Sequence, residues 1–145
     1  MIYTDGGRQA AGYRGSAGDC ACRAIAVGAQ LPYQAVYHII NAAASRERVT
    51  ARKRSRSSAR GGVYGSTVRA VLQDLGWTWV PTMQIGSGCR VHLRSDEMPT
   101  GRIIVRLSKH YTCLIDGIIH DTHDPSRNGT RCVYGYWIKG EKETT

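Results

Sequence analysis

The sequence contains no phenylalanine, so its aromatic packing must come from three Trp and eight Tyr residues. It also lacks an apolar run of about 20 residues, the length that a membrane-spanning helix needs. The opening residues 1–8 do not show the charged and then apolar pattern of a secretory signal. These absences argue against a membrane protein and against a secreted protein, and we expect a cytoplasmic chain.

A CxxC motif is absent as well, which argues against the common zinc sites. His120 and His123 are three residues apart, so on a strand they point to opposite faces and do not chelate together. We therefore expect neither a metal nor another cofactor. The five cysteines are an odd number without a secretory context, which predicts reduced thiols: Cys20, Cys22, Cys89, Cys113 and Cys132.

Acidic residues are scarce, with 11 Asp and Glu against 20 Lys and Arg. Residues 46–60 contain seven basic residues and one acidic residue, Glu47, so most of the net charge of +9 lies in this segment. Such charge density predicts a solvated, mobile basic loop over residues 46–62 that is dispensable for folding. The alternative is a contact for nucleic acid or an acidic partner, made by Arg52, Lys53, Arg54, Arg56 and Arg60. The segment between Arg46 and Gly62 has no aromatic residue that could stack on a base, which weakens that alternative.

The chain of 145 residues has the size of one domain, and we expect a single domain over residues 1–145 with a polar tail at 139–145. Apolar periodicity and stop signals predict three helices, at about 19–28, 32–45 and 65–76. Strands are expected at 77–81, 89–93, 102–107, 110–115, 118–121 and 132–138. Helices followed by strands indicate an α+β fold in which N-terminal helices pack on a C-terminal antiparallel sheet.

The clearest local signal is a hairpin over residues 110–121. Asp116-Gly117 lies between two apolar runs and predicts a two-residue type I′ turn. This turn pairs residue 115 with 118 and residue 112 with 121, so His110 and Asp121 share one face of the sheet. A carboxylate beside an imidazole fixes the tautomer of the ring and stabilises its charged form. We therefore expect a hydrogen bond between Asp121 and His110.

A nucleophile for such a pair is found near the N-terminus. Asp19 is a suitable N-cap for the first helix, which places Cys20 in its first turn. Unpaired amides and the helix dipole favour a thiolate there, whereas the charge of Asp19 opposes it. Cys22 lies on another side of the helix and is expected to pack in the core.

A Cys that opens an N-terminal helix, a His on a later strand and an acid on the next strand resemble the papain-like cysteine peptidases, and in particular the compact bacteriocin-processing peptidases. A narrower resemblance, to a family of small uncharacterised phage and prophage proteins, covers most of the chain. It rests on residues 17–20, 79–83, 85–89, 110–122 and 131–137.

These resemblances imply a papain-like fold and a thiol hydrolase of phage origin that cleaves a peptide, isopeptide or related acyl bond through an acyl-enzyme. Its substrate would be a host or phage protein, in the host cytoplasm. Cys20 would be the nucleophile, His110 the base and Asp121 its orienting acid. The papain-like oxyanion donor is a Gln six residues before the Cys, where this chain has Arg14; Gln9 and Ser16 are further candidates, and the Cys20 amide is available. The alternatives are a non-enzymatic protein that binds and blocks a host defence complex, and a nucleic-acid-associated protein.

Overall fold

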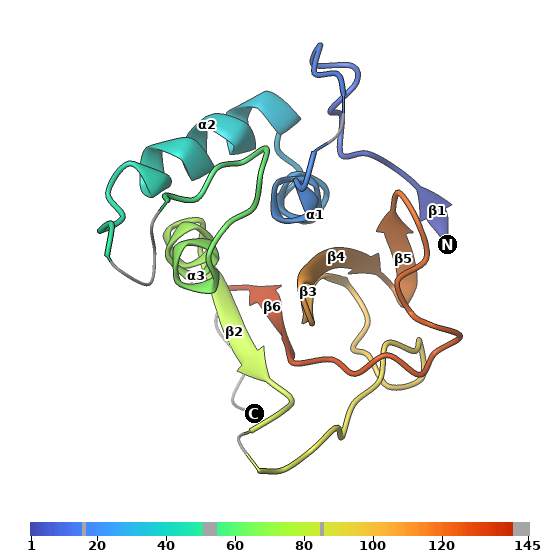
Figure 1. Ribbon diagram of the computed structural model, residues 1–145. Coiled ribbons are helices and arrows are strands. Elements are labelled where there is room, and N and C mark those ends of the chain that lie inside the picture. The colour runs from blue at the N-terminus through green and yellow to red at the C-terminus, as the bar shows by residue number, and fades with distance from the viewer. Residues whose placement is uncertain (16, 51–54, 85, 141–145) are drawn as a thin grey trace.

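The computed structural model describes residues 1–15, 17–50, 55–84 and 86–140 (Figure 1). Within these ranges it has three helices and six strands, which confirms the α+β class. The helices are α1 (Cys20–Ala29), α2 (Tyr33–Ala44) and α3 (Gly65–Asp74). The strands are β1 (Ile2–Tyr3), β2 (Trp77–Pro81), β3 (Arg102–Leu107), β4 (His110–Ile115), β5 (Ile118–Asp121) and β6 (Gly135–Lys139). None of the described helices combines the length and the apolar character that a bilayer span requires.

The strands form one sheet in the order β1-β5-β4-β3-β6-β2. All neighbouring strands are antiparallel except β1, which runs parallel to β5 and pairs Tyr3 with Asp121. The expected antiparallel sheet therefore carries one parallel edge strand, supplied by the first residues of the chain. The N-terminus lies beside β5 at this edge (Figure 1).

The central hairpin has the predicted register. Ile115 pairs with Ile118 and Cys113 with His120, and both turn residues, Asp116 and Gly117, have the positive φ of a type I′ turn. A second tight turn at Ser108 and Lys109 joins β3 to β4. These two hairpins place His110 at the start of β4 and Asp121 at the end of β5.

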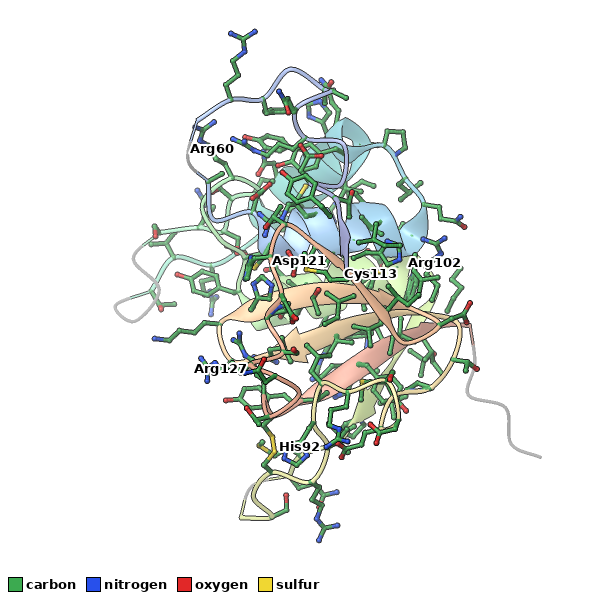
Figure 2. All side chains as sticks on the ribbon, turned by 90° about the vertical axis from the view of Figure 1, so that its right-hand side faces the viewer. Arg60, His92, Arg102, Cys113, Asp121 and Arg127 are labelled. Carbon is green, nitrogen blue, oxygen red and sulfur yellow. A yellow bond between two sulfur atoms is a disulfide. The ribbon has the colours of Figure 1, made fainter. Side chains whose placement is uncertain are left out.

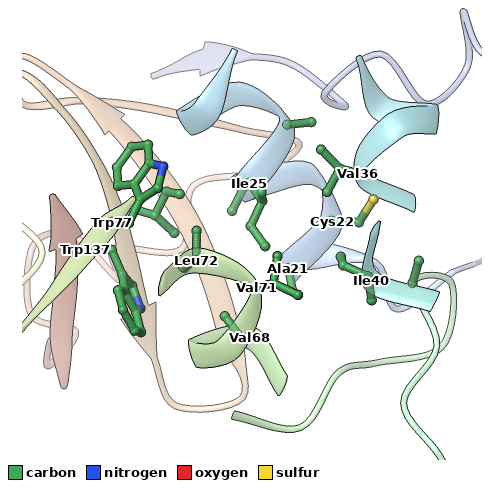
Figure 3. Close-up of a cluster of buried hydrophobic side chains, with 14 of the residues drawn as sticks. Ala21, Cys22, Ile25, Val36, Ile40, Val68, Val71, Leu72, Trp77 and Trp137 are labelled. Carbon is green, nitrogen blue, oxygen red and sulfur yellow. The ribbon is translucent and has the colours of Figure 1, made fainter. Parts of the chain in front are cut away.

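The helices cover one face of the sheet, and the loop around His92 lies on the other side (Figure 2). On the helical side Ile104 and Trp137 of the sheet pack against apolar residues of all three helices (Figure 3). Gly28 is part of this contact because a Cβ on it would lie 2.5 Å from the Ile104 side chain. The sequence predicts that the helix ends at Gly28, but α1 continues to Ala29, and Gln30 is its left-handed cap.

A disulfide joins Cys89 to Cys132, which contradicts the expectation that all five cysteines are free. The two residues are 43 positions apart, and only the folded sheet brings them together. Residues 89–93 were also predicted to form a strand, but they make a single bridge, from His92 to Cys132. Val91 and Leu93 pack with Ile103 and Val105 of β3 in a second cluster of apolar side chains, separate from the one that contacts the helices.

The basic segment is not a solvated loop over its whole length. Ala59 is completely buried and its N–H donates to Asn41 Oδ1 of α2 at 2.9 Å. The N–H of Ser57, also buried, donates to the carboxylate of Glu47, which accepts the Thr67 hydroxyl of α3 as well. The prediction is therefore wrong for residues 57–59, because one small apolar residue and several polar backbone groups dock between α2 and α3. Residues 51–54 and 141–145 of the predicted loop and tail lie outside the described part.

Candidate active site

Cys20 is the first residue of α1 and lies partly exposed in a pocket of about 360 Å³ that His110 also lines. The segment that ends in Gly61 and Gly62 forms part of the same pocket. It is held there because the Gly18 N–H donates to the carbonyl of Arg60 at 2.8 Å. Gly18 packs closely on Gly61, since a Cβ on Gly18 would lie 3.3 Å from the Gly61 oxygen and would be accommodated only if the backbone shifted slightly.

The other cysteines have different environments. Cys22 and Cys113 are buried, and burial raises the pKa of each thiol to about 12. Cys89 and Cys132 form the disulfide. Cys20 is therefore the one cysteine of the five whose surroundings favour a thiolate.

His110 and Asp121 form the expected pair. Their side chains approach across the hairpin, with His110 Nε2 2.8 Å from Asp121 Oδ2. Both residues are buried, and Asp121 is only 4% exposed. Because Nε2 is engaged by the carboxylate, Nδ1 is the ring nitrogen left for Cys20.

Asp121 is itself held from two directions. Its Oδ1 accepts the Thr122 N–H at 2.7 Å and lies 3.7 Å from the guanidinium of Arg23 on α1. Neither of the other two acids near the hairpin takes its place. Asp116 accepts the Gly101 N–H, and Asp124 accepts the Ser126 N–H in the following turn. This agrees with the prediction that Asp121, and not Asp124, contacts His110.

The electrostatics of the site couple the thiol to the imidazole. Burial alone would raise the pKa of Cys20, but hydrogen bonds with the His110 side chain and the Tyr111 backbone, together with the charges of His110 and Arg23, outweigh it. The pKa of Cys20 therefore lies below its ordinary value of 9.0. Burial would lower the pKa of His110, yet the hydrogen bonds with Asp121 and Cys20 raise it to about 9. These opposite shifts favour transfer of the thiol proton to the imidazole.

Asp19 does not act as the predicted N-cap, because its side chain makes no capping hydrogen bond. The buried carboxylate instead accepts hydrogen bonds from Arg23 and from the Tyr33 hydroxyl, the latter at 2.7 Å, with Arg8 3.6 Å away. Arg23 therefore joins two buried acids, Asp19 and Asp121. With its charge paired in this way, Asp19 does not oppose a thiolate at Cys20 as strongly as the sequence suggests.

Of the three candidate oxyanion side chains, the two that the structure describes are not brought to the thiol. Gln9 and Arg14 line a different pocket, together with Asp19 and Arg23, because the residues before α1 fold into their own turn. Asp5 accepts the Gln9 N–H at 2.9 Å in that turn. Ser16 lies outside the described residues. Among the candidates that the structure describes, the Cys20 N–H remains, as one of the amides in the first turn of a helix that have no partner within it.

Sequence reasoning missed most of the pocket wall. Arg106 of β3 and Lys109 of the β3–β4 turn line the pocket together with Tyr111 and the glycines at 61 and 62. The signals were present, since Gly61-Gly62 and the Ser108-Lys109 turn are visible in the sequence. What could not be foreseen is that the end of the basic segment lies against the start of α1.

The structure describes two of the five basic residues that were candidates for binding nucleic acid. Arg56 and Arg60 are exposed, and each donates to a backbone carbonyl, that of Glu47 and that of Arg14 respectively. Arg52, Lys53 and Arg54 lie outside the described residues. In the described part of the chain, no three His, Cys, Asp or Glu side chains gather in a way that would hold a metal ion.

Comparisons of the chain with family models, with curated proteins and with solved structures found no match.

Proposed function

We propose that this protein is a thiol hydrolase with a papain-like arrangement of Cys20, His110 and Asp121, which cleaves a peptide, isopeptide or related acyl bond. The observation that carries the proposal is the 2.8 Å contact between His110 and Asp121 beside Cys20, whose thiol has a lowered pKa. A nucleophile, a base and a group that orients the base are the three parts that nucleophilic acyl transfer requires.

The reaction proceeds in two steps. The Cys20 thiolate attacks the acyl carbon to form a thioester, the bond to the leaving amine breaks, and the His110 imidazolium gives that amine its proton. A water molecule then gives a proton to His110 and attacks the thioester, which releases a carboxylic acid product and regenerates the thiol. Asp121 stabilises the imidazolium in both steps, and the Cys20 N–H donates to the oxygen that becomes negative.

The proposal also carries the phage or prophage origin that the resemblances imply, with a host or phage protein as substrate in the host cytoplasm. The sequence of elements is the support for the papain-like topology. A helix that begins at the Cys packs against the strand that begins at the His, and the acid ends the next strand.

Hydrolysis of p-nitrophenyl acetate by the purified protein tests this function. We expect repeated turnover, a transient acetyl group on Cys20 detected by mass spectrometry, and no turnover by Cys20→Ala. Release of nitrophenol by Cys20→Ala at the wild-type rate would contradict the proposal. A folded wild-type protein that is inert in this assay would favour the alternative, a non-enzymatic protein that binds a host complex.

A further inference from the structure

The pocket beside Cys20 has two cations in its lining, Arg106 and Lys109. Arg106 extends along the N-terminal end of α3, where its guanidinium occupies the space next to Gly65, and a Cβ on Gly65 would lie 3.2 Å from one of its nitrogens. It is also close to Tyr111: burial raises the pKa of the Tyr111 hydroxyl, and the charge of Arg106 opposes that rise. Arg106 is thus placed over the pocket and not directed away into solvent.

These cations have no acidic partner within the part of the chain that the structure describes. The ion pairs found there involve neither Arg106 nor Lys109, and the pocket lining contains no Asp or Glu. Part of the remaining wall consists of backbone, because four glycines line it: Gly18, Gly61, Gly62 and Gly65. A pocket lined by glycine backbone and by two cations without an acidic partner suits an extended acyl chain that carries negative charge.

We propose that this pocket selects acyl substrates that carry a carboxylate close to the bond attacked by Cys20, with Arg106 and Lys109 as the groups that bind it. The inference rests on the proposed hydrolase function and names its substrate class. The planar guanidinium of Arg106 pairs with a carboxylate through two parallel hydrogen bonds, and the Lys109 ammonium adds a point charge. An acidic side chain or a terminal carboxylate of a peptide supplies such a group.

A pair of small alkylating reagents tests this without a known substrate. Iodoacetate and iodoacetamide react with the same thiolate, but only iodoacetate carries a carboxylate. We measure the rate of each at Cys20 by mass spectrometry and take the ratio of iodoacetate to iodoacetamide, with free cysteine as the reference. We expect the ratio at Cys20 to exceed the reference by about tenfold at low salt and to decline as the ionic strength rises to about 1 M.

Charge-neutral variants separate the two cations from the imidazolium of His110, which also attracts iodoacetate. Arg106→Gln and Lys109→Gln should each lower the ratio by about threefold, and the double variant by more. Arg90→Gln is the matched control, because Arg90 is an exposed cation that does not line the pocket, and its ratio should equal that of the wild type.

The outcomes distinguish the two proposals. A Cys20 that reacts rapidly with iodoacetamide but shows the ratio of free cysteine, or variants that leave the ratio unchanged, overturns the carboxylate specificity alone. A Cys20 that reacts with neither reagent below pH 8 removes the nucleophile, and the proposed function and the specificity then fail together.

Discussion

At the scale of single residues, the site depends on how a buried charge is shared. Asp121 lies between two positive groups, the imidazole of His110 and the guanidinium of Arg23, and Arg23 also contacts Asp19. Removing one member of such a buried network leaves another charge unpaired, which costs far more than an exposed ion pair contributes. The acid that orients His110 is thus also part of what holds α1 against β5.

The substitution Asp121→Asn tests the role of this charge. The amide keeps a hydrogen bond to His110 but cannot stabilise the imidazolium, so the thiolate fraction of Cys20 should fall. We expect the rate of Cys20 alkylation by iodoacetamide at about pH 7 to drop by about tenfold, the equivalent of one pKa unit. Asp124→Asn is the control, because Asp124 contacts Ser126 and not the imidazole. Equal rates in wild type and Asp121→Asn would show that the carboxylate does not set the state of the thiol.

The titration of His110 gives a second prediction at this scale. Its pKa is raised from 6.5 to about 9, so its contribution to stability is complete below pH 6.5 and is lost as the pH rises through about 9. Titration of the ring by NMR should find this high pKa in the wild type and a lower value in Cys20→Ala, which removes one of the two hydrogen bonds. An ordinary pKa near 6.5 in the wild type would contradict the pairing.

The acid–base pair could be predicted from the sequence because it depends on local geometry. A two-residue turn at Asp116-Gly117 fixes which residues oppose each other, and the register then brings Asp121 to His110. The side chain of Asp19 could not be predicted in this way. A residue before a helix is normally a cap, and its use as a buried partner of Arg23 and Tyr33 depends on how α2 packs against α1.

At the scale of elements, hydrogen bonds at the end of the basic segment connect it to two helices. Asn41 of α2 accepts the buried N–H of Ala59, and Glu47 connects Ser57 to α3. These hydrogen bonds hold the segment so that Gly61 and Gly62 lie beside Cys20. Composition alone could not predict this docking, because seven basic residues dominate the segment and only a few small residues in it make the contacts.

Asn41→Ala should therefore destabilise the protein by ~1–3 kcal/mol, since it leaves a buried amide without an acceptor. Urea denaturation measures this difference, and Asn41→Asp is the matched control because it keeps an accepting oxygen at the same place. Deletion of residues 50–60 should cost more, because it also removes the buried Ser57 and Ala59. An Asn41→Ala protein as stable as the wild type would mean that this contact does not hold the segment.

At the scale of the whole molecule, the disulfide ties the loop at Cys89 to the chain that leads into β6. It closes 43 residues of sequence, and breaking a cross-link of this kind costs ~2–4 kcal/mol. We expect Cys132→Ser to lower the free energy of unfolding by this amount and a reducing agent to have the same effect on the wild type but none on the variant. A count of three free thiols in the protein unfolded without a reducing agent would establish the bond, and a count of five would contradict it.

The pairing of β1 with β5 has a consequence for the timing of synthesis. Ile2 and Tyr3 have their sheet partners at His120 and Asp121, and the Thr4 N–H donates to the carbonyl of Asp121. Contacts so distant in sequence form late, because the entropy cost of closing a long loop comes before the contacts stabilise the fold. A nascent chain therefore exposes Cys20 long before the imidazole of His110 and its acid exist to activate it, and the thiol acquires its reactivity only after Asp121 has been translated.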